Sequence, residues 1–308
     1  MVLVLLSAVS AKKKDASIPS GQVKLSDGSF PELLVTIEQI CNGVVKMAGF
    51  SGPEGRFTVD DSDSTGCEVR AYLPGYRSRS VALPGPDLGT IVLEPRGKKD
   101  SAARSTKTKE FNKSARKAYE KGLDDAAKGK WRAAEDEFQM TIKLFGGASS
   151  AWLSLGMVQE REGDAIAAKH SYKQAIGVEA GFALPYFQAA AIEVSRGEWE
   201  EALSDSNKII ELDAESFPGA YLMNAWANLN THHMDVAETR AREGIKLDTE
   251  HRFPELEYVL GLVLIDKVDG PGAIEHLKSY LALDPKGARA AAARAELTRL
   301  EQPKQSTP

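Results

Sequence analysis

The carboxy-terminal part of the chain repeats one arrangement of apolar and polar positions. Between Trp131 and Leu144, apolar or small residues recur three or four positions apart and therefore share one face of a helix. The five copies of this face are Ala134, Phe138, Thr141, Leu144; Ala168, Tyr172, Ala175, Val178; Ala202, Ser206, Ile209, Leu212; Ala237, Ala241, Gly244, Leu247; and Ala273, Leu277, Tyr280, Leu283. Their leading alanines are 34, 34, 35 and 36 residues apart. Twelve residues before each alanine lies another small residue: Gly122, Gly156, Ala190, Ala225 or Gly261. Each period therefore predicts two antiparallel helices whose backbones approach closely.

A two-helix period of this length is typical of an α-solenoid, because one helix pair cannot bury its apolar face alone. The residues resemble tetratricopeptide repeats (TPR), and the second copy carries the family pattern best, with Trp152, Leu155, Gly156, Ala168, Tyr172 and Ala175. Agreement is partial, since Ser206 and Ala241 stand where an aromatic is usual and only the last repeat has the closing proline, Pro285. The resemblance implies an all-α solenoid over residues 112–300. Its five TPR-like repeats are expected at about 115–148, 149–182, 183–217, 218–253 and 254–285, with a capping helix at 286–300 and a disordered tail at 301–308.

The amino-terminal part alternates apolar and polar residues in short runs instead. Seven runs rich in β-branched and aromatic residues begin near Val23, Leu33, Val44, Arg56, Glu68, Arg79 and Thr90. Between them lie turn-forming stretches rich in glycine, proline, aspartate and serine, which predicts a small β-sandwich over residues 20–95. The order of a DG turn, V-T-I, G-R-F-T-V and L-P-G-Y-R-S resembles the transthyretin-like carboxypeptidase regulatory domain and its carbohydrate-binding relatives. The expected fold class is multidomain α+β, with a prealbumin-like sandwich followed by the solenoid.

Composition fits two domains with their own cores, since the chain has 308 residues, of which 42% are hydrophobic. No apolar run is long enough to span a bilayer. Residues 1–19 begin with MVLVLLSAVSA, in which Val9 and Ala11 are placed as in a signal-peptidase site, but no basic segment precedes them. This is either a truncated export signal at 1–11 or a disordered tail. We favour the export signal, which predicts a periplasmic or secreted bacterial protein.

Two cysteines, Cys41 and Cys67, lie at strand edges of the predicted sandwich. In an exported protein such a pair is expected to form one disulfide, whereas in a cytosolic protein it would be two buried thiols. Because the export signal favours an oxidising compartment, we expect the disulfide.

Residues 96–111 form a linker of different composition. Together with the start of the first repeat, up to Lys117, it contains nine basic and two acidic residues, a net charge of +7 in a chain of net charge −5. The expectation is a solvated tether with few contacts between the domains. The alternative is contact with an anion, either nucleic acid or lipid; the lack of interleaved aromatic residues argues against nucleic acid.

Motifs of catalysis do not occur in the sequence. There is no H-E-x-x-H, G-x-S-x-G, P-loop or C-x-x-C, and the adjacent His232 and His233 have no evident third ligand. The resemblance to a carboxypeptidase regulatory domain therefore does not predict peptidase activity. We expect a non-enzymatic protein with no catalytic residue, cofactor or metal.

What remains is the surface of the repeats. The TPR resemblance implies that the first helix of each repeat lines a concave groove that binds partners. Mapped onto this chain, the groove positions are Leu153, Met157, Phe187, Val194, Leu222, Trp226, Leu229, Tyr258, Leu262 and Ile265. This apolar strip predicts binding of an apolar helix or extended segment. The carboxylate-clamp positions of some TPR cochaperones are instead Tyr119, Leu123, Ser154, Leu184 and Gln188, so that clamp is not expected.

The sequence thus predicts an interaction scaffold or adaptor that binds protein partners through its TPR groove. One alternative is a carbohydrate or cell-envelope binder, in which the sandwich aromatics Phe50, Tyr72 and Tyr76 contact the ligand and the repeats act as a spacer. The other is the non-catalytic subunit of an envelope enzyme.

Overall fold

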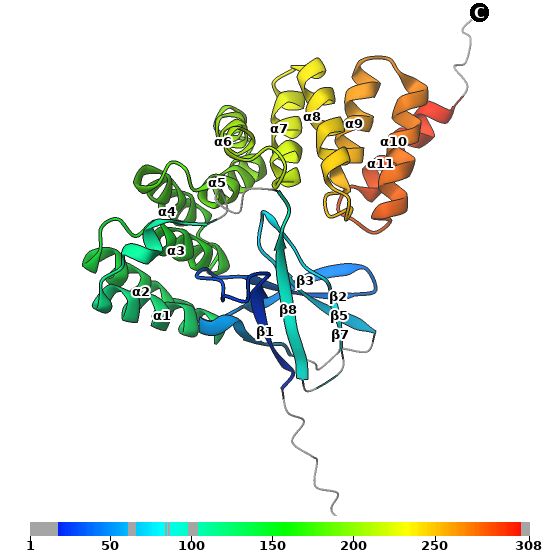
Figure 1. Cartoon of the computed structure of the whole chain (residues 1–308). Coiled ribbons are helices and arrows are strands. Elements are labelled where there is room, and N and C mark those ends of the chain that lie inside the picture. Colours follow the sequence, from blue (N-terminus) through cyan, green and yellow to red (C-terminus); the bar gives the residue numbers. More distant parts are fainter. Residues whose placement is uncertain (1–17, 61–65, 84, 86, 98–103, 303–308) are drawn as a thin grey trace, which may run out of the picture.

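The computed structural model describes residues 18–60, 66–83, 85, 87–97 and 104–302. The predicted export signal at 1–11, the middle of the linker and the end of the carboxy-terminal tail lie outside these described residues. In the described part, a β-sandwich is followed by a solenoid of paired helices that curves around it (Figure 1).

The sandwich consists of two four-stranded sheets. One sheet has the order β4-β1-β8-β6, with β4 at Arg56–Thr58, β1 at Ser20–Leu25, β8 at Asp87–Pro95 and β6 at Tyr76–Arg77. The other has the order β3-β2-β5-β7, with β3 at Val44–Phe50, β2 at Thr36–Cys41, β5 at Cys67–Tyr72 and β7 at Val81–Ala82. Their alternating residues pack a core that includes Val23, Ile37, Val69 and Leu93, as the period-two pattern predicts.

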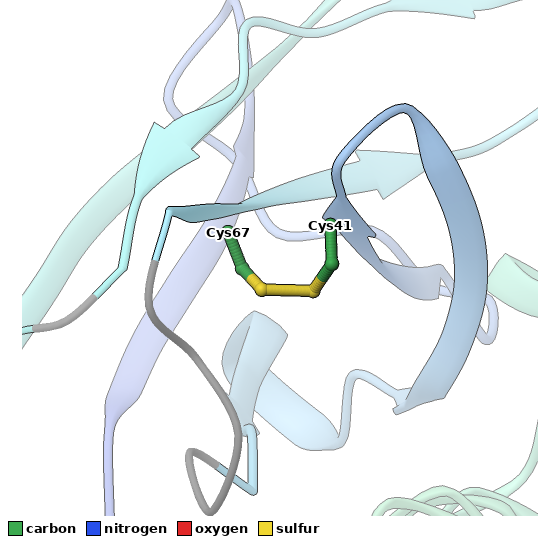
Figure 2. The surroundings of a disulfide bond; sticks show 2 residues. All are labelled: Cys41 and Cys67. Carbon is green, nitrogen blue, oxygen red and sulfur yellow. A yellow bond between two sulfur atoms is a disulfide. The ribbon is translucent and has the colours of Figure 1, made fainter.

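Cys41 and Cys67 face each other on neighbouring strands β2 and β5 and form a disulfide (Figure 2). The bond closes a loop with a sequence separation of 26 residues. On a chain-entropy model, a loop of this length stabilises the folded state by about 3 to 4 kcal/mol. This is a large contribution for a small sandwich.

Ten helices form five consecutive antiparallel pairs in the described chain. The pairs are α1 (Lys113–Ala127) with α2 (Trp131–Leu144), α3 (Ser149–Arg161) with α4 (Ala165–Val178), α5 (Ala183–Arg196) with α6 (Trp199–Leu212), α7 (Pro218–Asn230) with α8 (Met234–Leu247), and α9 (Glu255–Asp266) with α10 (Gly270–Leu283). The first helices α5, α7 and α9 contact one another in sequence, and the solenoid bends toward this side.

The small residue in each first helix lets its partner helix approach. A Cβ added at Gly156 would overlap the ring of Tyr172, and a Cβ added at Gly122 would lie 2.6 Å from Phe138. Tyr172 and Phe138 are fully buried, so neither ring has free space to move into. The spacing of twelve residues therefore marks the closest approach of the two helices.

The last helix, α11 (Ala290–Glu301), packs Ala293 and Leu297 against the fifth pair. It begins four residues later than the sequence analysis expected. Pro285 to Arg289 instead form turns, in which the Arg289 N–H donates a hydrogen bond to the Tyr280 hydroxyl at 3.2 Å. This turn fixes the backbone position of Arg289.

The expectation of a solvated tether between nearly independent domains is wrong. Buried side chains of the sandwich and of the first three repeats belong to one continuous apolar core. The described parts of the linker pack on the solenoid, and Lys107–Glu110 form a short 3-10 helix, η2, that contacts α3. The sandwich lies on the concave side of the solenoid (Figure 1).

Candidate functional site

The candidate site is the concave face of the solenoid, for which the sequence predicts an open groove. The structure divides the ten predicted groove residues into two groups. Four are buried: Leu153, Met157, Phe187 and Tyr258. Six are half-buried: Val194, Leu222, Trp226, Leu229, Leu262 and Ile265. A fully open apolar strip is therefore not present, and the reason differs along the face.

At the amino-terminal end, the sandwich itself covers the concave face. The β3 residue Phe50 packs edge-on against Trp131 with ring centroids 6.1 Å apart. The Tyr119 hydroxyl on α1 donates a hydrogen bond to the Glu32 carbonyl at 2.8 Å. Phe50 and Tyr119 are buried, so this contact excludes water. The first repeat is therefore packed against the sandwich.

The described carboxy-terminal part of the linker packs on the second repeat. Ser105 donates a hydrogen bond to the Glu179 carboxylate at 2.7 Å, and the Thr106 N–H donates to its other oxygen at 2.8 Å. Thr108 is buried and donates to Ser150 at 2.9 Å. These short polar side chains carry no apolar period, which is why the sequence pattern indicated a free tether.

In the middle of the face, Phe187 packs within the solenoid. Its ring centroid lies 6.1 Å from that of Phe217. A Cβ added at Gly219 would clash with the rings of both Phe187 and Phe253. Tyr72 and Tyr76 of the sandwich border this cluster across a void of only about 10 Å³. Phe187 is thus a core residue between two repeats and the sandwich.

Charged residues join the sandwich to the fourth and fifth repeats. Arg252, in the loop before α9, donates to both carboxylate oxygens of Glu38 at 2.5 and 3.1 Å. Its guanidinium lies 3.4 Å from the centroid of the Tyr72 ring. Arg70 from the sandwich also pairs with Glu38 at 3.0 Å. The side chains of Glu38 and Arg252 are only 9% and 13% exposed, so the pair is largely shielded from water.

A second ion pair reinforces this contact. Arg96, at the start of the linker, binds Glu250 at 2.7 Å, and its side chain is 5% exposed. The Arg96 Nε also donates to the Tyr76 carbonyl at 3.3 Å. Arg96 is therefore part of the interface and not of a solvated basic patch.

The carboxy-terminal part of the face is different, because an aromatic cluster there stays half open. The ring centroid of Trp226 on α7 lies 6.0 Å from that of Tyr258 on α9. The Tyr258 centroid in turn lies 5.4 Å from that of Tyr280 on α10. Arg289 lies over the Trp226 ring, 5.1 Å from its centroid. Around Trp226 are the half-buried Leu222, Leu229, Leu262 and Ile265. Arg289 had no signal in the sequence, since it fell within a helix expected only to cap the solenoid.

A buried charge network connects the second and third repeats. The Glu193 carboxylate is fully buried and lies 2.9 Å from Lys173 and 3.3 Å from Lys169. Lys173 also binds Asp205 at 2.5 Å. Burial raises the pKa of Asp205 from 3.8 to about 6, and repulsion from Glu193 adds to this, while the hydrogen bond from Lys173 opposes it. The network holds the three helices α4, α5 and α6 together, so it has a structural role.

Two further properties bear on function. No helix in the described residues is both long and apolar enough to cross a membrane. Within the same residues, no three histidine, cysteine, aspartate or glutamate side chains are grouped so that they could hold a metal ion.

Comparison with known proteins identifies the fold through the solenoid. No protein-family model and no curated protein sequence matches this chain. Among solved structures, YrrB, described as a TPR protein with an unusual peptide-binding site, aligns with TM-score 0.52 and 19% identity over 63% of this chain and 100% of its own. MamA from Desulfovibrio magneticus RS-1 aligns with TM-score 0.51 and 13% identity over 58% of this chain and 99% of its own. A tetratricopeptide repeat protein from Parabacteroides merdae ATCC 43184 gives TM-score 0.53 and 17% identity over 61% and 74%.

At such low identity these neighbours are informative about fold alone. All three are TPR proteins, and they align with about as much of the chain as the five helix pairs and the last helix occupy. The chain therefore consists of a small amino-terminal β-sandwich followed by a TPR-like solenoid.

Proposed function

We propose that this protein is a non-catalytic interaction scaffold that binds an apolar segment of a partner protein on the carboxy-terminal part of its concave face. The observation that carries the proposal is the half-open cluster around Trp226, which remains where the sandwich no longer covers the solenoid. We call Leu222, Trp226, Leu229, Leu262 and Ile265 the open strip. Clusters of aromatic and aliphatic side chains of this kind dominate the energy of protein interfaces.

The earlier residues of the predicted groove are excluded from this proposal. Leu153, Met157 and Phe187 belong to the continuous core that includes the sandwich, so a partner would have to displace a whole domain to contact them. Tyr258 is buried beneath the open strip and packs against Trp226.

A capture experiment tests the proposal. The full-length protein, immobilised, is exposed to extract of its source cells, and retained proteins are identified by mass spectrometry and then titrated in purified form. Trp226→Ala should weaken binding by about thirtyfold, as expected for an aromatic hot spot of about 2 kcal/mol. Ile166→Ala is the matched control, because Ile166 is 71% exposed on the second-helix side and its loss should leave binding unchanged.

Trp226→Ala also removes packing against Tyr258, so its melting temperature must be measured in parallel. Leu229→Ser provides a second, milder change in the open strip. A partner that binds both variants as tightly as the wild type would contradict the proposal.

Carbohydrate binding by the sandwich is the weaker alternative. It needs exposed aromatic rings, but Phe50 and Tyr76 are buried and Tyr72 lies under Arg252. These rings serve the domain interface. The resemblance of the sandwich to a carboxypeptidase regulatory domain therefore suggests a docking module more than a sugar-binding one.

We also propose an extracytoplasmic location, in the envelope of a bacterium. The Cys41–Cys67 disulfide supports it, because such bonds persist in oxidising compartments and are rare in the cytosol. Fractionation of source cells, with detection of the protein in the periplasm or medium, tests this location.

A further inference from the structure

The open strip ends at a cation, Arg289, that forms no ion pair with the described residues. Arg289 is exposed, and its guanidinium lies 5.1 Å from the centre of the Trp226 ring. No carboxylate within the described residues comes within the 4.0 Å of an ion pair with it. The positive charge of Arg289 acts on the Glu255 carboxylate electrostatically, but the two side chains form no such pair.

Several basic side chains of this solenoid form ion pairs. Arg252, Lys267 and Arg299 have carboxylate oxygens at 2.5, 2.6 and 2.8 Å, respectively. The chain as a whole carries a net charge of −5, so carboxylates are plentiful. Arg289, in contrast to these three, has no ion pair within the described residues, and it lies beside the open strip.

Arg289 is also held in place. Its backbone N–H donates to the Tyr280 hydroxyl at 3.2 Å, and the Tyr280 ring packs at a tilt against Tyr258, which packs in the same way against Trp226. Contact with the indole restricts the guanidinium further, because a cation within about 6 Å of an aromatic face is attracted to it. A pre-positioned guanidinium loses little entropy when it binds a planar carboxylate, which it can grip with two parallel hydrogen bonds.

From this arrangement we infer that the partner segment pairs an apolar side chain, seated on the open strip, with a carboxylate bound by Arg289. The inference rests on the proposed function and names the chemistry of its partner. Apolar contacts supply most of the affinity, and the ion pair selects acidic over basic segments, because a like charge beside Arg289 is repelled.

A random 16-residue peptide library displayed on phage provides the test, with the full-length protein as bait. Wild type, Trp226→Ala and Arg289→Glu are used in parallel selections, and enriched peptides are synthesised and titrated. We expect wild-type peptides to contain aspartate or glutamate near an apolar residue and to lose about fivefold or more in affinity for Arg289→Glu. The charge-reversed variant should enrich lysine or arginine at the same place.

The outcomes separate this inference from the proposed function. Peptides that need Trp226 but bind Arg289→Glu and wild type equally would overturn the inference and leave the scaffold function standing. Enrichment that is independent of Trp226 would overturn both. Arg289→Gln, which removes the charge but keeps the backbone contact with Tyr280, is the second variant, and unchanged peptide affinity for it would also overturn the inference.

Discussion

Removal of the Arg252 side chain should destabilise the whole protein, although Arg252 lies in a loop. Its guanidinium binds both oxygens of Glu38 and stacks on Tyr72, and the pair is only 13% and 9% exposed. Breaking a buried ion pair from one side costs about 3 to 5 kcal/mol, because the remaining charge stays buried without its partner. Arg70 still pairs with Glu38 at 3.0 Å, so we take the lower part of that range and add about 1 kcal/mol for the lost cation–π contact.

Arg252→Ala should therefore lower the free energy of unfolding by about 3 to 4 kcal/mol. Urea unfolding, followed by circular dichroism and by tryptophan fluorescence, measures this change. Arg252→Lys should recover only part of it, since lysine cannot form the two parallel bonds or stack on the ring. A double-mutant cycle with Glu38→Gln isolates the coupling between the two side chains.

Arg242→Ala is the matched control. Arg242 pairs with Glu238 within one helix, and its side chain is 49% exposed, so its loss should cost less than about 0.5 kcal/mol. If Arg252→Ala costs no more than this control, Arg252 is solvated in solution and the docked arrangement of the sandwich is wrong.

Three other predictions concern single features. Gly156→Ala should lower the free energy of unfolding by about 1 to 3 kcal/mol, because the added Cβ overlaps Tyr172. Gly177→Ala is the control and should be neutral or stabilising, since an added Cβ there meets nothing within 4 Å. Equal effects of the two substitutions would refute the helix register. Denatured, unreduced protein from an oxidising compartment should release no thiol to Ellman's reagent, and two thiols would contradict the Cys41–Cys67 bond. Because the pKa of Asp205 is raised to about 6 in the folded state, Asp205 favours folding below about pH 4, and this contribution is lost as the pH rises through 6. Asp205→Asn should therefore raise the melting temperature at pH 7.5 more than at pH 4.5, and a larger gain at pH 4.5 would contradict the shift.

The solenoid could be predicted from the sequence because its packing repeats. Gly156 packs against Tyr172, and the equivalent glycines Gly122 and Gly261 pack in the same way against Phe138 and Leu277. A local pattern therefore specifies this contact, and the fold class is confirmed by the structure. The disulfide was expected because the export signal favoured an oxidising compartment for the two cysteines, which lie at predicted strand edges. These features depend on residues that are close in sequence or in a fixed register.

Docking of the sandwich could not be predicted in this way. Arg252 and Glu38 are separated by 214 residues, and Arg96 and Glu250 by 154, so no local period relates them. Charged residues in loops usually indicate solvated surface, and here they form the buried part of an interface. Phe50 likewise gave no sign of whether it faced water, a ligand or Trp131.

The open strip was predicted in part. Trp226 followed from the position of the first helices, but its burial against Tyr258 and Arg289 depends on how the last helix packs. Periodicity places a residue on a helix face, and the neighbours of that face decide its exposure.

A cross-link between the two domains tests the central claim, that the sandwich is packed against the concave side of the solenoid. A Cβ added at Gly52 would lie 3.0 Å from the Ala127 Cβ on α1, so a small shift brings two cysteines there to the spacing of a disulfide. The double variant Gly52→Cys, Ala127→Cys should form this bond in the folded monomer under mild oxidation. Peptide mapping after proteolysis would then identify residues 52 and 127 as linked. If both new cysteines instead remain fully open to alkylation in the folded protein, the sandwich does not pack against the solenoid as described.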